Sequence, residues 1–200
     1  MRKIKKIFNG FLPVVLDCEM SGVNPAQNAL LEIAAFHLDL DQNQLVVGPA
    51  FHQHVIGFEG AMYNEKAMKV NGIIPDHPLR FAIEERVMME KFQDFLHQRI
   101  REVGAKRAIL VGHNIHFDLN FLLACQERTG IELPIHHFCV IDTATLGVLM
   151  FHETVLSKIL KKAKIDFDQA QAHGALYDAQ KTAEVACYIF NHFLENKAKD

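Results

Sequence analysis

The sequence predicts an α/β fold in which helices flank one mixed central sheet. Three apolar runs typical of strands come first, and alternating strand and helix patterns follow, which favours an α/β or α+β arrangement around one mixed sheet. Half of the 200 residues are hydrophobic and 22% are charged, which is enough apolar material for a sizeable core. This composition excludes intrinsic disorder as the main state, and the length favours one domain over residues 1–200.

The first half of the chain predicts three strands and one long helix. Residues 14–18, 30–40 and 50–55 have the apolar character of strands, with a turn at 41–43. Residues 80–101 predict an amphipathic helix, because apolar residues recur at helical spacing along one face. The apolar residues on that face are Met88, Phe92, Phe95, Leu96 and Ile100.

The second half alternates strands and helices. The predicted elements are a strand at 107–113, a helix at 117–129, a short strand at Val140 and Ile141, helices that begin at Thr143 and Val155, and a final helix at 175–196. Gly130 predicts the end of the helix at 117–129, because glycine adopts the left-handed conformation that closes a helix.

Charge and cysteine usage exclude several classes of protein. The formal charge of −3 argues against a histone-like or polybasic coat protein, although a local basic patch can still bind nucleic acid. The four cysteines are far apart and form no C-x-x-C pair, which favours free thiols in the cytoplasm over a disulfide framework or a zinc ribbon.

The N-terminus predicts a basic arm rather than a targeting segment. Residues 1–10 include Arg2, Lys3, Lys5 and Lys6, and the apolar segment that follows is short and contains a proline. This pattern is not that of a secretory signal, and no apolar run reaches the length of about 18 residues that a transmembrane helix needs. We therefore expect a cytoplasmic protein that does not associate with membranes.

Two acidic residues lie two positions apart at the end of the first predicted strand. Because residues i and i+2 share a face of a strand, Asp17 and Glu19 are expected to point the same way and Cys18 to the other face. Neighbouring carboxylates repel unless a cation neutralises them, and oxygen ligands suit Mg²⁺ or Mn²⁺ better than Zn²⁺. For an isolated D-x-E pair, a solvated strand end is the commoner alternative.

Two further acidic blocks follow. Asp118 ends the segment Gly112-His-Asn-Ile-His-Phe-Asp at the start of a predicted helix, where a capping acid is an equal alternative. Asp178 lies in the first turns of the final helix, and Gly174 allows His173 to sit on a mobile lead-in segment. A neutral histidine can take a proton from water near neutral pH.

The three acidic blocks, taken in order, resemble the DEDDh family of 3′→5′ exonucleases. The D-x-E, H-N-x-x-F-D and H-x(4)-D blocks match the motifs of this family in its order. The similarity extends over nearly the whole chain. Further shared stretches are residues 10–15, 29–35, 71–73, 154–158, 166–168 and 172–173. The resemblance implies a ribonuclease H-like fold.

The resemblance also implies hydrolysis of phosphodiester bonds with two metal ions. Asp17 would bridge two Mg²⁺ ions, with Mn²⁺ as a substitute, while Glu19 and Asp178 would complete their shells. Asp118 would hold the second ion, and two such ions stabilise the attacking and leaving oxygens of an in-line displacement. His173 would belong to the metal site as well and would be the general base for the attacking water. The implied products are nucleoside 5′-monophosphates released from a 3′-hydroxyl end.

Other candidate positions have competing interpretations. Asp142 resembles a family position that supports the site, and the alternative is an N-cap for the helix that begins at Thr143. The chain has 12 histidines, most of which are expected to be structural or exposed. His52 and His54 have the spacing to share a strand face, but no third ligand is near them in the sequence, so they are predicted to be surface residues.

The resemblance implies that aromatic side chains stack on the terminal bases of the bound strand. The matching positions are Val23, Val70, Phe117 and Phe138, and only the last two are aromatic. Stacking contributes about 1–3 kcal/mol per base, so valine at the other two predicts a looser grip and an altered sequence preference. The alternative is that Phe117 and Phe138 belong to the core.

A homodimer is implied as well, in which a basic patch on one subunit feeds RNA into the partner's site. The candidate patch residues are Arg101, Lys106, Arg107, Lys5 and Lys6. Ile7 and Asn9 stand where the family carries arginines, so the patch is expected to be weaker or relocated. A solvated charged face is the alternative.

Three functions remain open. The first is Mg²⁺-dependent 3′→5′ trimming of tRNA and other structured RNAs, with single-stranded DNA as a further substrate. The second is oligoribonuclease-like degradation of very short RNA, which the opening Asp17-Cys-Glu-Met-Ser-Gly resembles, or DNA proofreading. The third is an inactive RNA-binding or scaffolding dimer, and the presence of all five expected site residues argues against it.

Overall fold

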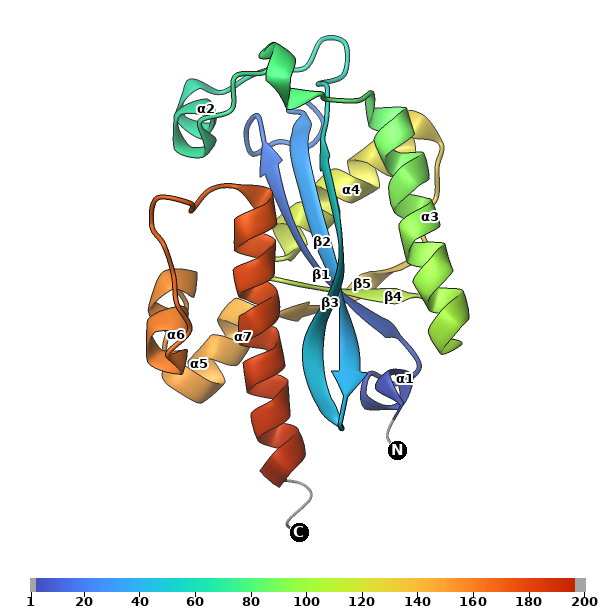
Figure 1. Cartoon of the computed structure of the whole chain (residues 1–200). Helices are drawn as coiled ribbons and strands as arrows, with labels where there is room; N and C mark the ends of the chain where they lie inside the picture. The colour runs from blue at the N-terminus through green and yellow to red at the C-terminus, as the bar shows by residue number, and fades with distance from the viewer. Residues whose placement is uncertain (1–2, 197–200) are drawn as a thin grey trace.

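A mixed sheet forms the centre of the molecule (Figure 1). The computed structural model describes residues 3–196, so the outermost residues of the predicted domain, 1–2 and 197–200, lie outside the described part. The strands of this part are β1 (Leu12–Met20), β2 (Leu30–Asp41), β3 (Gln44–His54), β4 (Ala108–Gly112) and β5 (Ile135–Asp142). Their order is β3-β2-β1-β4-β5. β1 pairs antiparallel with β2 and parallel with β4, which confirms the mixed sheet.

Helices cover both faces of this sheet. They are α1 (Ile4–Ile7), α2 (Glu65–Asn71), α3 (Glu85–Val103), α4 (His116–Thr129), α5 (Thr143–Phe151), α6 (Leu156–Ala163) and α7 (Ala175–Asn196), with a 3-10 turn at Pro78–Arg80. The predicted helices at Thr143, at Val155 and over 175–196 are confirmed, and Gly130 closes α4 with a φ of 69°. The organisation of residues 1–200 as one domain stays a prediction.

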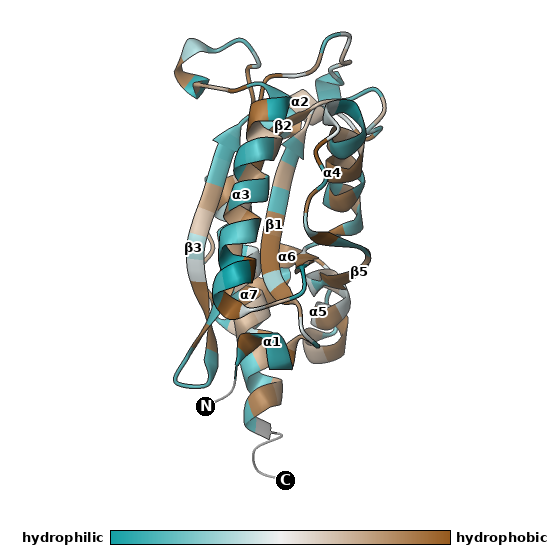
Figure 2. Cartoon of the chain, turned by 90° about the vertical axis from the view of Figure 1, so that its right-hand side faces the viewer, coloured by the Kyte–Doolittle hydropathy of each residue, from teal (hydrophilic) through white to brown (hydrophobic). Residues whose placement is uncertain are grey.

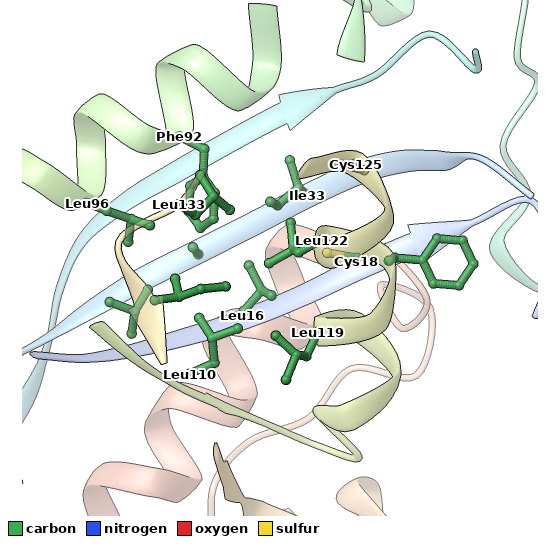
Figure 3. Close-up of a cluster of buried hydrophobic side chains, with 14 of the residues drawn as sticks. Leu16, Cys18, Ile33, Phe92, Leu96, Leu110, Leu119, Leu122, Cys125 and Leu133 are labelled. Atoms are coloured by element: carbon green, nitrogen blue, oxygen red, sulfur yellow. The ribbon is translucent and has the colours of Figure 1, made fainter. Parts of the chain in front are cut away.

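One face of the sheet packs against α3 and α4. Alternate residues of β1, including Leu16 and Cys18, point into this core (Figure 3). Phe92 and Leu96 approach them from α3, as the helical spacing predicted, and Leu122 approaches from α4. The outer surface of α3 is hydrophilic, so this helix buries only one side (Figure 2).

The opposite face packs against α7. Small side chains line the buried side of this helix and allow its backbone to approach the sheet closely. They are Ala175, Ala179, Ala183 and Ala186. Val15 of β1 and Ala34 of β2 pack against them from the sheet. The ends of β1 and β2 extend beyond the N-terminal end of α7 (Figure 1).

Several predicted boundaries are wrong, and β5, for example, begins at Ile135 rather than at Val140. The helix assigned to 80–101 begins at Glu85, because the segment before it pairs with the end of β3: the N–H of Ile83 donates to the carbonyl of His54 at 3.0 Å. β3 begins at Gln44 rather than near residue 50. Gln42 and Asn43 both have positive φ, which makes a two-residue hairpin turn and pairs Asp41 directly with Gln44.

Two short helices, α1 and α2, were not predicted from the sequence. Each spans too few residues to show a helical period. Among residues 3–196, none of the helices combines the length and the apolar character that a membrane crossing requires.

Candidate active site

The candidate active site is built from carboxylates that β1 and α7 bring together. Asp17 and Glu19 alternate with the core residues of β1 and therefore lie on the face that α7 covers, together with Val15. Asp178 lies in the first turn of α7. One oxygen of each of these three carboxylates lies within 4.8 Å of the others. Cys18 lies in the opposite core, so the prediction that Asp17 and Glu19 share a face is confirmed.

Asp118 approaches the site from α4. Its carboxylate is buried, and its Oδ1 accepts a hydrogen bond of 2.9 Å from the backbone N–H of Cys18. Gly112, which precedes the turn into α4, allows close packing: a side chain there would meet Ile115 at 2.5 Å and the carbonyl of Leu16 at 2.9 Å. Asp118 is therefore anchored to β1 beside Asp17, outside the group of three converging oxygens.

The buried carboxylates have too little positive charge near them for all of them to be ionised at neutral pH. Burial raises the pKa of Asp17 well above its ordinary value, and the charges of Asp118 and Glu19 raise it further. Burial also raises the pKa of Glu19 to about 8, with the charge of Glu32 as the next cause. The pKa of Asp118 rises to about 7, again chiefly through burial. A bound cation would reverse these shifts.

The donor set fits a hard divalent cation. Asp17, Glu19 and Asp178 offer only carboxylate oxygens to the point where they converge. Oxygen ligands of this kind suit Mg²⁺ or Mn²⁺, whereas Zn²⁺ prefers nitrogen and sulfur ligands. The raised pKa values and the donor chemistry therefore agree that this group is a candidate metal centre.

His173 contacts this group through its backbone. Its N–H donates a 2.9 Å hydrogen bond to Oδ2 of Asp178, while its side chain is exposed. Burial raises the pKa of Asp178, and this N–H opposes the rise. His173 has a φ of 68°, a left-handed conformation that is uncommon outside glycine, directly before Gly174. The lead-in segment therefore brings His173 next to Asp178 without a shared helical face.

A cleft of about 800 Å³ opens beside the carboxylates. Asp17, Glu19 and Asp118 line it together with three of the predicted base-contacting residues, Val23, Val70 and Phe117. Val23 is 77% exposed and Val70 is 60% exposed, so both are accessible to a ligand.

The two phenylalanines predicted to contact bases differ in their surroundings. Phe117 is half-buried, and it packs against the core next to Phe121 while it also lines the cleft. Phe138 lies on β5, outside the residues that line the cleft, and is 90% exposed. The alternative that Phe138 belongs to the core is therefore wrong.

The candidate basic patch lies at the other end of β1. Leu12, at the start of β1, donates its N–H to the carbonyl of Arg107, and the neighbouring N–H of Lys106 donates to Gly10. Nζ of Lys5 donates to the carbonyl of Gly104 at the end of α3. Lys6, Arg101, Lys106 and Arg107 are exposed. The structure thus gathers the patch residues of the N-terminus and of the α3–β4 loop at the end of β1 that is far from the carboxylates.

Asp142 is a helix cap, and it also supports the turn beside the cleft. Its Oδ1 accepts hydrogen bonds from the N–H of Ala144 at 2.8 Å and from the N–H of Asn114 at 3.3 Å. Asn114 has a φ of 59° and lines the cleft. Asp142 therefore holds this strained turn in addition to starting α5.

Two groups of residues near the site were missed. His113 lines the cleft, its Nδ1 lies 3.1 Å from Oγ1 of Thr143, and burial lowers its pKa; its place in the H-N-x-x-F-D block was the available signal. The prediction that His52 and His54 are surface residues without a third ligand is wrong. Glu32 of β2 lies between them, and sequence spacing does not show which residue a neighbouring strand places opposite.

Solved structures with a similar fold are exonucleases. E. coli exonuclease I in complex with a dT13 oligonucleotide superposes with a TM-score of 0.71 at 13% identity, over 94% of this chain and 43% of that chain. The chain thus spans less than half of that protein. A full-length 3′-exonuclease superposes with a TM-score of 0.70 at 18% identity, over 92% of this chain and 83% of that chain. These similarities show the ribonuclease H-like fold that the sequence predicted.

Sequence comparison is more specific. Ribonuclease T of Histophilus somni (strain 129Pt) is 44% identical over 191 residues, which cover 94% of this chain and 88% of that protein. Ribonuclease T of Vibrio cholerae is 42% identical over 193 residues, which cover 95% of this chain and 86% of that protein. The family model described as "Exonuclease" matches residues 14–186 and so spans all four candidate carboxylates. The chain therefore belongs to the exonuclease family that includes ribonuclease T.

Proposed function

We propose that this protein is a Mg²⁺-dependent 3′→5′ exoribonuclease that trims the 3′ ends of tRNA and other structured RNAs. The observation that carries the proposal is the convergence of Asp17, Glu19 and Asp178 within 4.8 Å beside an open cleft. Family membership supports the exonuclease reaction, and the ribonuclease T relatives support RNA as the substrate. The products are nucleoside 5′-monophosphates.

The carboxylates hold the metal ions. Two Mg²⁺ ions, when bound, supply Lewis-acid stabilisation of the attacking and the leaving oxygens of the scissile phosphate. Asp17 is common to both parts of the arrangement, since its carboxylate converges with those of Glu19 and Asp178 and also interacts electrostatically with Asp118. The hydrogen bond from Cys18 N–H fixes the carboxylate of Asp118 relative to β1, and therefore relative to Asp17.

His173 takes the proton of the attacking water. Its side chain is exposed, and its backbone is hydrogen-bonded to Asp178. A neutral imidazole that faces solvent can accept this proton and pass it to the surrounding water. The bond to Asp178 ties the position of the base to that of a metal-binding carboxylate.

The cleft accepts a single strand. The cleft has a volume of about 800 Å³ and is lined by residues of β1, α2 and α4, among which Phe117 offers an aromatic surface for stacking. Val23 and Val70 offer apolar contacts without stacking, so we propose a looser grip on the terminal bases and activity on single-stranded DNA as well.

The basic patch points to a homodimer. Lys5, Lys106 and Arg107 lie at the opposite end of β1 from the carboxylates of their own subunit. In a dimer this patch would contact RNA whose 3′ end lies in the partner's cleft, as clustered cations bind phosphates without reading sequence. We place the protein in the cytoplasm, where the free thiols of its four cysteines stay reduced.

The product profile on three substrates tests this function. A tRNA with an extended 3′ tail, a ribodinucleotide and single-stranded DNA are incubated with Mg²⁺, and the released nucleotides are identified. We expect stepwise shortening of the tail with release of 5′-monophosphates. A much faster reaction on the dinucleotide would favour the short-RNA alternative. That alternative is consistent with valine rather than an aromatic residue at positions 23 and 70. Efficient cleavage of a circular RNA would contradict an exonuclease.

A further inference from the structure

Three side chains outside the carboxylate group converge at one end of β2 and β3. His52 and His54 lie two positions apart on β3, so their rings leave the same face of the strand. The register pairs His54 with Glu32 of β2 and His52 with Ala34. Glu32 is therefore the direct neighbour of His54, and Ala34 adds only a methyl group beside His52.

The two oxygens of Glu32 face different imidazoles. Nε2 of His52 lies 2.7 Å from Oε1 of Glu32, and Nδ1 of His54 lies 3.9 Å from Oε2. The ring centroids of the two histidines are 5.0 Å apart, with the planes inclined by 71°. One ligand atom from each of the three residues lies within 4.8 Å of the others. The lone pairs of two nitrogens and one oxygen can thus meet at one point.

Burial adds an independent observation. Glu32 is 7% exposed, and Nδ1 of His54 is a buried polar atom that has no hydrogen-bond partner among the described residues. A buried polar atom without a partner is unfavourable, and coordination of an ion is one way to satisfy it. The histidine side chains are about 30% exposed, so an ion from solvent can reach the group.

We propose that Glu32, His52 and His54 form a second metal site that binds a divalent transition-metal ion of the Zn²⁺ class. Two imidazoles and one carboxylate are a ligand set that Zn²⁺ and its first-row neighbours use, with the remaining positions open to water. This ligand set disfavours Mg²⁺, because Mg²⁺ prefers oxygen ligands in octahedral geometry.

The site is separate in chemistry from the neighbouring carboxylates. Glu32 and Glu19 are cross-strand partners, so both groups lie on the same face of the sheet. The salt bridges of Glu32 run to the two histidines. The nearby Arg80 donates to the carbonyls of Leu31 and Val55, which holds its guanidinium on the backbone and leaves the Glu32 oxygens to the imidazoles.

Binding of Co²⁺ and Zn²⁺ to the full-length protein tests the proposal. The experiment uses an Asp17→Asn background, which weakens metal binding at the catalytic carboxylates. Co²⁺ is followed by its visible absorption and Zn²⁺ by calorimetry. We expect one ion per chain and Co²⁺ bands typical of nitrogen ligands. His54→Gln should weaken Zn²⁺ binding by at least about tenfold, since even the loss of an outer partner of a metal ligand has that effect.

A matched control and a second variant keep the test decisive. His192→Gln makes the same substitution at an exposed histidine of α7 and should leave Zn²⁺ affinity unchanged. Circular dichroism checks that each variant folds, and Glu32→Gln, which keeps a hydrogen-bond acceptor for His52, replaces His54→Gln if the latter unfolds. Unchanged Zn²⁺ affinity in His54→Gln and in Glu32→Gln, or displacement of Co²⁺ by millimolar Mg²⁺, would overturn the proposal.

Discussion

Two groups of potential metal ligands lie side by side on one face of the sheet, and they differ in what surrounds their buried carboxylates. Asp17, Glu19 and Asp178 place only carboxylates together, and their pKa values rise as a result. Glu32, in contrast, lies between two imidazoles that can donate to it or share an ion with it. A bound cation would relieve the repulsion within the first group, whereas in the second group the imidazoles already lie beside the carboxylate.

The difference shows how function can oppose stability within one fold. Carboxylates that repel each other destabilise the native state until a cation binds, and that repulsion favours cation binding. The group around Glu32 joins β2 to β3 through a hydrogen bond that forms without an added ion. Substitutions of the catalytic carboxylates should therefore lower activity and raise the stability of the metal-free protein, whereas substitutions in the group around Glu32 should lower stability.

The largest effect is expected for Asp17→Asn. Activity on a tailed RNA should fall by about a thousandfold, comparable to the loss of a major group that stabilises transition-state charge. The metal-free protein should nevertheless become more thermostable, because asparagine avoids the cost of burying a carboxyl group among other carboxylates. Steady-state kinetics and thermal unfolding in EDTA measure the two effects. Asp94→Asn, an exposed position of α3, is the control and should change neither. Full activity of Asp17→Asn at matched Mg²⁺ would refute the ligand assignment.

A smaller loss is expected for His173→Gln. Removal of the proposed base should lower kcat by about a hundredfold. Mn²⁺ affinity should stay nearly constant, because the backbone N–H of His173, rather than its ring, bonds to Asp178. Kinetics and Mn²⁺ binding followed by electron paramagnetic resonance separate the two roles. A parallel loss of activity and Mn²⁺ affinity would show that the ring is a metal ligand instead.

The pH dependence of stability should distinguish the metal-free from the metal-bound protein. The pKa of Glu19 rises from 4.5 to about 8 in the native state, so this state keeps a proton that the unfolded chain has lost. The resulting stability is fully present below pH 4.5 and is lost as the pH rises through about 8. In EDTA, the free energy of unfolding obtained from thermal melts should therefore fall by a few kcal/mol over this pH window, and Mg²⁺ should restore it. A flat profile in EDTA would contradict the charge imbalance; Glu19→Gln should flatten it.

The smallest effect links the two groups. The charge of Glu32 is the largest electrostatic contribution to the raised pKa of Glu19, after burial. Glu32→Gln should therefore move the pH-dependent loss of stability in EDTA toward lower pH without abolishing it. The same melts measure the shift of the midpoint, and Glu195→Gln on the exposed side of α7 serves as the matched control. An unchanged midpoint would mean that the two groups act independently.

Much of the fold follows from local pattern. The predicted final helix has the same bounds as α7, and the first strand, the helix end at Gly130 and the shared face of Asp17 and Glu19 were all predicted. Each depends on neighbours in the chain, because a strand alternates every second residue and a helix repeats every 3.6 residues. Those periods are visible in the sequence.

Other features depend on partners that are distant in the sequence. The pairing of Val55 with Ile83 delays the start of α3, and the 90% exposure of Phe138 depends on what packs against β5. No periodicity of the local sequence encodes such contacts.

The carboxylates and the histidines illustrate the same division. The sequence alone determined which acidic residues belong to motif blocks and on which kind of element each one lies. Only the tertiary structure decided that Asp178 meets β1, that Asp118 is anchored to Cys18 N–H, and that Glu32 lies between His52 and His54. The physical reason is that the register of a sheet and the docking of a helix minimise the free energy of the whole chain, to which residues far apart in sequence contribute together.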